Sequence, residues 1–100
     1  MYVGCCSIKF YLHGNHSLKG KRRIVRALRD RLKNNFNVSI AEIGDQNFWQ
    51  NLHMGIVAVN SDPKYLEGQM GKLVNAIEKM HLAELTDCKI QITRLGPNTN

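Results

Sequence analysis

The sequence predicts a single-domain α+β fold whose elements follow the order strand, helix, strand, strand, helix, strand. Residues 3–12 and 88–95 alternate apolar and polar side chains, as strands with one buried face do, and 37–43 and 52–59 also read as strands. Between them, two segments repeat apolar residues at the three- and four-residue steps of a helix. A chain of 100 residues is long enough to bury one core.

The first strand and the first helix are joined by a turn around Gly14. The strand places on one side Cys6, Ile8, Phe10 and Leu12. The other side of this strand, with part of the last strand, forms the face of the sheet that we expect the helices to leave uncovered. Ser17 suits the N-cap of the helix, which we expect to end in the asparagine-rich segment 33–37. The predicted core stripe of this helix is Leu18, Val25, Leu28, Leu32 and Phe36.

The two middle strands are separated by the segment "GDQNFWQN", which is too long for a tight hairpin. Phe48 and Trp49 stand out in this polar connection. We expect Trp49 to pack as a lid on the core. The alternative is that it stacks on a nucleic-acid base or on a protein partner.

The second helix begins at "SDP", where a capping side chain precedes proline at the first helical position. Gly68 and Gly71 fall on its outward side, and its core stripe is Leu66, Met70, Leu73 and Ile77. With the last strand, the order matches the split βαβ pattern of ferredoxin-like folds. We therefore expect a four-stranded antiparallel sheet with two helices on one face, over residues 1–95, and a flexible tail at 96–100.

The positive charge of the chain is concentrated in residues 17–33. This segment holds eight Lys or Arg and one acid (8 − 1 = +7), whereas the rest holds six basic and seven acidic residues (6 − 7 = −1). Steps of 100° along a helix place Arg22, Arg26, Arg29 and Lys33 on one stripe beside the core face. Such a stripe is either a solvated surface or a surface that binds a polyanion.

Two features favour a polyanion, with RNA as the leading candidate. Residues 22–31 contain five Arg and no Lys, and the planar guanidinium suits bidentate phosphate contacts. Like charges four residues apart also destabilise a helix, which mixed charges would avoid. The predicted nucleic-acid contacts are Lys19, Lys21, Arg22, Arg26, Arg29 and Lys33.

The start of the first helix is a second candidate site. Free backbone N–H groups there, with His16 and Ser17 beside them, could seat one phosphate. An ordinary capped helix start is the alternative.

Other chemistry has little support in the sequence. Three cysteines make a poor disulfide framework, and without a Cys-x-x-Cys pair we expect neither a metal site nor a cofactor. The carboxylates are too scattered to predict acid–base catalysis. No signal peptide and no run of ~18 apolar residues occurs, so we expect a cytoplasmic protein without a membrane partner.

The segments "SLKGKRRIVRALRDRL", "FNVSIAEI", "WQ" and "MGIVAV" resemble the YlxP-like family of small bacterial proteins of unknown function, and the similarity runs from about Tyr2 to Leu95. The resemblance implies a ferredoxin-like fold and no known catalytic residues. It also implies a gene often found beside those for translation initiation factor 2 and ribosome-binding factor A. Relatives tend to carry an acid where this chain has Gly20, and such an acid would complete a capping box. We therefore expect a weaker and more mobile helix start here.

Together these observations predict a non-enzymatic module that binds RNA or a ribosomal particle through the phosphates that meet its basic helix. The alternative is a homodimeric protein-interaction module. In that case the open sheet face or the second helix meets the partner, and the basic helix is merely solvated.

Overall fold

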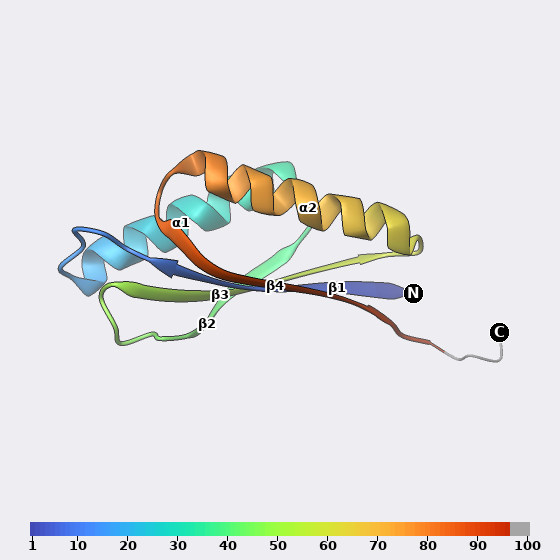
Figure 1. The fold of residues 1–100 in the computed structure, drawn as a ribbon, viewed down its shortest axis with the longest axis horizontal. Helices are drawn as coiled ribbons and strands as arrows, with labels where there is room; N and C mark the ends of the chain where they lie inside the picture. Colours follow the sequence, from blue (N-terminus) through green and yellow to red (C-terminus); the bar gives the residue numbers. More distant parts are fainter. Residues whose placement is uncertain (97–100) are drawn as a thin grey trace.

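The computed structural model describes residues 1–96 and confirms the predicted order of elements (Figure 1). The elements are β1 (Tyr2–Tyr11), α1 (Leu18–Asn35), β2 (Ser39–Gly44), β3 (Asn51–Asn60), α2 (Pro63–Met80) and β4 (Glu84–Arg94). The predicted flexible tail at 96–100 lies, apart from Gly96, outside the described residues.

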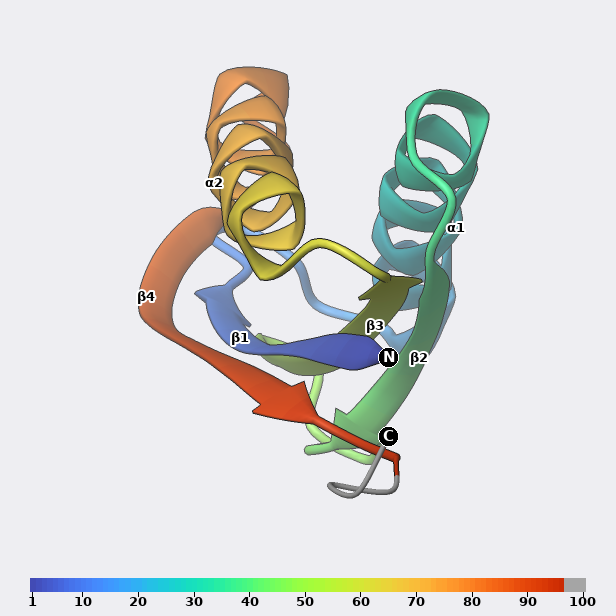
Figure 2. The same ribbon diagram turned by 90° about the vertical axis from the view of Figure 1, so that its right-hand side faces the viewer.

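The four strands form one antiparallel sheet in the order β2-β3-β1-β4. Both helices cover the same face of this sheet, α1 over the side of β2 and α2 over the side of β4, as Figure 2 shows. This is the predicted ferredoxin-like arrangement. The opposite face, which we call the open face, is not covered by either helix of residues 1–96.

β4 begins at Glu84, four residues before the predicted start at 88 (88 − 84 = 4). Residues 84–87 pair with the end of β1, where Tyr11 lies opposite Glu84 and Phe10 opposite Leu85. The register shifts between Lys9 and Phe10, as at a β-bulge. This shift interrupts the alternation from which the strand was predicted.

The core lies between the sheet and the helices. From β1 it receives the predicted inward side chains, among them Ile8, and from β3 it receives side chains such as Met54; both are at most 1% exposed. The buried residues of α2 are the predicted stripe Leu66, Met70, Leu73 and Ile77. The buried residues of α1 are Lys21, Val25, Leu28 and Leu32. The other two residues of the predicted stripe, Leu18 and Phe36, are half-buried.

Each helix begins at its predicted cap. Ser17 Oγ accepts a hydrogen bond from the Gly20 N–H at 2.9 Å, and Asp62 Oδ1 accepts one from the Lys64 N–H at 3.0 Å. Over residues 1–96, neither helix has the length and apolar character needed to cross a membrane.

Candidate nucleic-acid interface

A groove of about 430 Å³ runs along the side of α1 and is closed by β2 and the start of the loop that follows it. We call it the arginine groove. Its lining residues are Leu18, Lys21, Arg22, Val25, Arg26, Arg29, Glu42, Gln46 and Asn47. The sequence placed Arg22, Arg26 and Arg29 on one side of the helix, and their common groove confirms this.

The arginines of the groove have no acidic partner within residues 1–96. The ion pairs there are His13–Glu84 and Lys21–Glu42. Arg22 and Arg26 are exposed and Arg29 is half-buried. The three guanidinium groups therefore place positive charge in one hollow, where the carboxylate among the lining residues, Glu42, is already paired with Lys21.

Two further predicted contacts, Lys19 and Lys33, lie at opposite ends of α1. Both are exposed, but neither lines the arginine groove. Lys33 lines a separate, shallow hollow with residues 34–38. The structure thus brings three of the six predicted cations together and leaves these two as neighbours of the groove along the helix.

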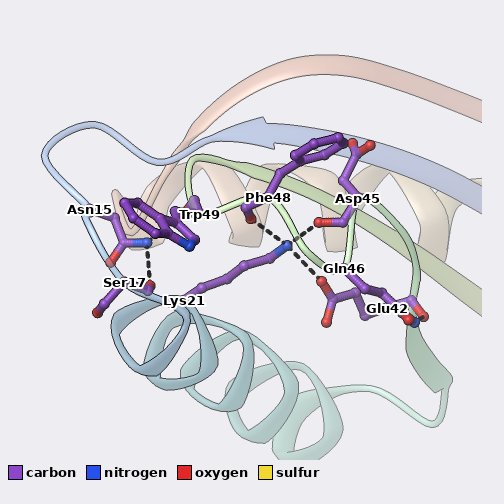
Figure 3. Close-up of polar contacts among 8 residues, drawn as sticks. All are labelled: Asn15, Ser17, Lys21, Glu42, Asp45, Gln46, Phe48 and Trp49. Carbon is purple, nitrogen blue, oxygen red and sulfur yellow. Dashed lines mark hydrogen bonds and ion pairs between the residues drawn. The ribbon is translucent and has the colours of Figure 1, made fainter.

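The prediction for Lys21 is wrong, because its side chain is directed inward. Lys21 is 2% exposed. Its Nζ lies 2.9 Å from Glu42 Oε2 and donates hydrogen bonds to the backbone oxygens of Phe48, at 2.9 Å, and of Asp45 (Figure 3). An ammonium group has three donors. Two of them bind the loop oxygens, and the ammonium charge is paired with the Glu42 carboxylate, so this buried side chain is not free to contact an RNA phosphate.

The ion pair between Lys21 and Glu42 ties α1 to β2. Glu42 Oε2 is buried, and within the described residues it accepts no hydrogen bond, so the attraction of the Lys21 ammonium is its polar compensation. A buried charge that loses its partner destabilises a fold strongly. The pair therefore fixes the wall of the arginine groove formed by Glu42.

The connection between β2 and β3, which we call the 45–50 loop, is held by side chains from outside it at three of its backbone oxygens. Lys21 binds two of them, and the Asn15 amide donates to the third, that of Trp49. The loop also closes on itself, since the Phe48 N–H donates to the Asp45 oxygen at 3.1 Å. These contacts leave the loop backbone facing inward, toward the start of α1 (Figure 3).

The rings of the 45–50 loop point away from the core. Phe48 is 58% exposed and Trp49 is 54% exposed. The prediction that Trp49 forms a lid on the core is therefore wrong. Trp49 is exposed because the backbone of the loop is directed inward, where its oxygens accept hydrogen bonds from Lys21 and Asn15. The side chains of the loop are therefore directed outward.

The start of α1 is occupied by the chain's own side chains. Besides the cap by Ser17, the Asn15 amide donates to the Ser17 oxygen at 2.9 Å. Asn15 Oδ1 lies in the space that a Cβ at position 20 would need, so Gly20 makes room for this amide. His16 is exposed. The start is thus a capped helix, and a phosphate at His16 and Ser17 remains a prediction.

The remaining reactive side chains do not gather into a site. Cys5, Cys6 and Cys88 are all free, and burial, with a smaller effect of Cys88, raises the pKa of Cys6 from 9.0 to about 12. Over residues 1–96, His, Cys, Asp and Glu form no group of three that could hold a metal ion. Ser7 and His53 share a hydrogen bond of 2.7 Å on the open face, which the sequence did not indicate.

The open face also carries exposed apolar side chains. Ile43, Val57 and Val59 are 53%, 39% and 56% exposed. Val57 lies opposite Cys5 of β1 and Ser39 of β2, near the middle of the sheet. This patch is the structural basis for the dimer alternative.

Comparisons with known proteins agree with the fold. The family described as "Protein of unknown function (DUF503)" matches residues 3–90. The uncharacterized protein YlxP of Bacillus subtilis (strain 168) is 33% identical over 84 residues, which cover 84% of this chain and 91% of that protein. Among solved structures, the de novo designed protein Foldit4 superposes with a TM-score of 0.52 at 13% identity, covering 95% of this chain and 98% of its own. That likeness concerns the fold alone.

Proposed function

The chain belongs to the DUF503 family of proteins of unknown function, and we propose that it is a non-enzymatic module that binds RNA or a ribosomal particle. In this proposal, phosphates of the RNA backbone lie in the arginine groove. The observation that carries the proposal is the common groove of Arg22, Arg26 and Arg29, which pair with no carboxylate of residues 1–96.

The free-energy cost of this arrangement supports a binding role. Arg22 and Arg26 are four residues apart, and Arg26 and Arg29 are three apart, so each pair repels by roughly 0.2–0.5 kcal/mol. A bound phosphate relieves this repulsion and accepts bidentate hydrogen bonds from a guanidinium.

Lys33 and Lys19 extend the positive charge toward the two ends of α1. A backbone that follows the groove would meet Lys33 after Arg29, because the two lie on the same stripe. Contacts of this kind fix the position of an RNA without reading its sequence. The gene neighbours implied by the family resemblance favour RNA of the translation machinery over other polyanions.

The salt dependence of RNA affinity tests this proposal. With Arg22, Arg26, Arg29 and Lys33 each neutralising one phosphate, log affinity should fall against log salt with a slope of about −3 to −4, at ~0.7–0.9 per phosphate. Arg26→Gln should reduce the magnitude of that slope by about one. Arg31→Gln is the matched control, since Arg31 is exposed on the same helix but lies off the stripe.

A variant with Gln at all four positions gives the decisive result. If it binds RNA as tightly as the parent protein does, the groove has no binding role and the basic helix is merely solvated. Circular dichroism of the same variant checks that its fold is retained.

The second candidate function is a homodimer formed through the open face, favoured by the exposed patch of Ile43, Val57 and Val59. Sedimentation in low and high salt separates the two functions. A dimer that persists in high salt, carries no nucleic acid and is dissociated by Val57→Lys would favour this second function. Nucleic acid that co-purifies in low salt and is lost in high salt would favour the first.

A further inference from the structure

Two aromatic rings stand in water at the tip of the 45–50 loop. Phe48 and Trp49 are each more than half exposed, and Trp49 is the single tryptophan of the chain. Exposing large apolar surface to water is unfavourable, and neighbouring exposed rings are typical of surfaces that a ligand covers. The loop therefore differs from an ordinary polar connection.

The backbone beneath these rings is fixed. Lys21, at 2% exposed, holds the backbone oxygens of Asp45 and Phe48, and Asn15 holds that of Trp49. Figure 3 shows Trp49 beside Asn15 and Phe48 on the other side of the Lys21 ammonium. A surface whose support is already ordered loses little conformational entropy when a ligand binds. The backbone that carries the two rings is thus already ordered, and we call these two exposed rings the platform.

The platform adjoins the arginine groove. Residues Asn47 to Asn51 line a hollow of about 420 Å³, and Asn47 also lines the groove. A ligand that leaves the groove at this end passes directly onto the aromatic loop. Because the groove offers uncompensated positive charge, the ligand that fits both parts carries negative charge along its length and flat apolar groups beside it.

We propose that this ligand is single-stranded RNA, with phosphates in the arginine groove and bases stacked on Phe48 and Trp49. The inference rests on the proposed function and adds the form of RNA that is bound. A duplex keeps its bases stacked inside, so it offers the groove its backbone but offers the rings nothing. A strand with unpaired bases satisfies both parts, as in proteins that combine a basic groove with aromatic stacking.

The test compares a mixed-sequence RNA strand of about 12 nucleotides, a length within known site sizes, with the duplex it forms with its complement. The single strand should bind more tightly and quench Trp49 fluorescence. Trp49→Ala should weaken single-strand binding by about 5- to 150-fold, the equivalent of one base–aromatic stack, and leave duplex binding unchanged. Tyr65→Ala is the matched control, because Tyr65 is an aromatic residue 61% exposed on α2.

Arg26→Gln separates the two proposals, since it should weaken both RNA forms alike. If the parent binds neither form, the proposed function itself fails. If the parent binds both forms equally and Trp49→Ala affects neither, the groove binds RNA and the stacking platform is wrong. If Trp49→Ala instead dissociates a dimer and leaves RNA binding intact, the rings meet a protein partner and the inference is overturned.

Discussion

The two helices occupy related places in the fold and differ at one buried position. Each has 18 residues, and each buries four residues with the same spacing of four, three and four. In α2 the first of these is Leu66, which approaches Gly4 of β1. In α1 it is Lys21, which binds Glu42 and the 45–50 loop. The first buried position therefore packs the core in one half and organises a loop in the other.

The two helices also differ in net charge. α1 carries eight basic residues and one acid (8 − 1 = +7), whereas α2 carries three basic and two acidic residues (3 − 2 = +1). Helix packing alone would be satisfied by either composition. The contrast teaches that the features pointing to function, namely the arginine groove and the held loop, belong to the half built on α1.

Replacing Lys21, the first buried residue of α1, with an apolar residue like the one in α2 should have the largest effect on stability. Lys21→Met leaves the Glu42 carboxylate without its ammonium and releases two loop oxygens, so we expect the free energy of unfolding to fall by about 3–5 kcal/mol. Urea denaturation measures this loss. The matched change in α2, Leu66→Met, conserves volume and should cost less than about 1.5 kcal/mol.

The double variant Lys21→Met with Glu42→Gln sharpens this test. Removing the charge from position 42 should recover part of the lost stability, because an uncompensated buried carboxylate causes much of the loss. If Lys21→Met and Leu66→Met lower the free energy of unfolding by equally small amounts, the Lys21–Glu42 pair contributes no more to stability than an ordinary core residue does.

The glycines of the two helices should respond to the same substitution with opposite signs. A Cβ at Gly68 meets nothing within 4 Å, so Gly68→Ala should stabilise the fold by up to about 1 kcal/mol through helix propensity. A Cβ at Gly20 meets Asn15 Oδ1, and Gly20→Ala should displace the amide that binds Ser17 and Trp49. We expect a net loss of about 1 kcal/mol from those two hydrogen bonds.

Thermal denaturation of both glycine variants measures the difference. A gain of stability at Gly20 as well as at Gly68 would show that the Asn15 tie contributes nothing. Trp49 fluorescence provides an independent signal, since the Gly20 change should alter the surroundings of the loop and the Gly68 change should not.

The smallest effect concerns repulsion within α1. At spacings of three and four residues, Arg26 has Arg22, Arg23 and Arg29 as helix neighbours against the single acid Asp30, so Arg26→Gln should raise the free energy of unfolding by about 0.2–0.5 kcal/mol at low salt. In α2, the residues three and four positions from Lys72 are uncharged: Gly68, Gln69, Asn75 and Ala76. Lys72→Gln should therefore leave the free energy of unfolding unchanged. Urea denaturation at low and high salt checks both. A loss of stability on Arg26→Gln would indicate that the arginine serves folding rather than binding.

Much of the fold could be predicted because one period dominates each element. The stripe of α2 and the inward residues of β1 are apolar without exception, so their spacing alone identified them. The start of β4 was missed because the register shift after Lys9 hides the alternation. Where the backbone departs from regular strand geometry, the alternation of apolar and polar residues no longer predicts the strand.

The candidate site was harder to predict, because the residue that holds the groove wall and the 45–50 loop in place, Lys21, is a buried lysine. Lysine is almost never fully buried without a partner, so Lys21 was assigned to the surface. A signal did exist: positions 21, 25, 28 and 32 repeat the spacing of 66, 70, 73 and 77. The outward direction of Trp49 had no such signal, since it depends on loop carbonyl groups that accept hydrogen bonds from the distant residues Asn15 and Lys21.

The central place of β1 in the sheet has a consequence for how the chain is made. β1 first meets β3 at Tyr11 and Asn51, 40 residues apart (51 − 11), and last meets β4 at Tyr2 and Arg94, 92 residues apart (94 − 2). At about 5–20 residues per second, a growing chain waits roughly 2–8 seconds before the first partner is even synthesised. Pairing between such distant segments is also slow to close. A nascent chain therefore keeps both edges of β1 without hydrogen-bonded partners for seconds, while α1 is the first element able to cover its apolar side.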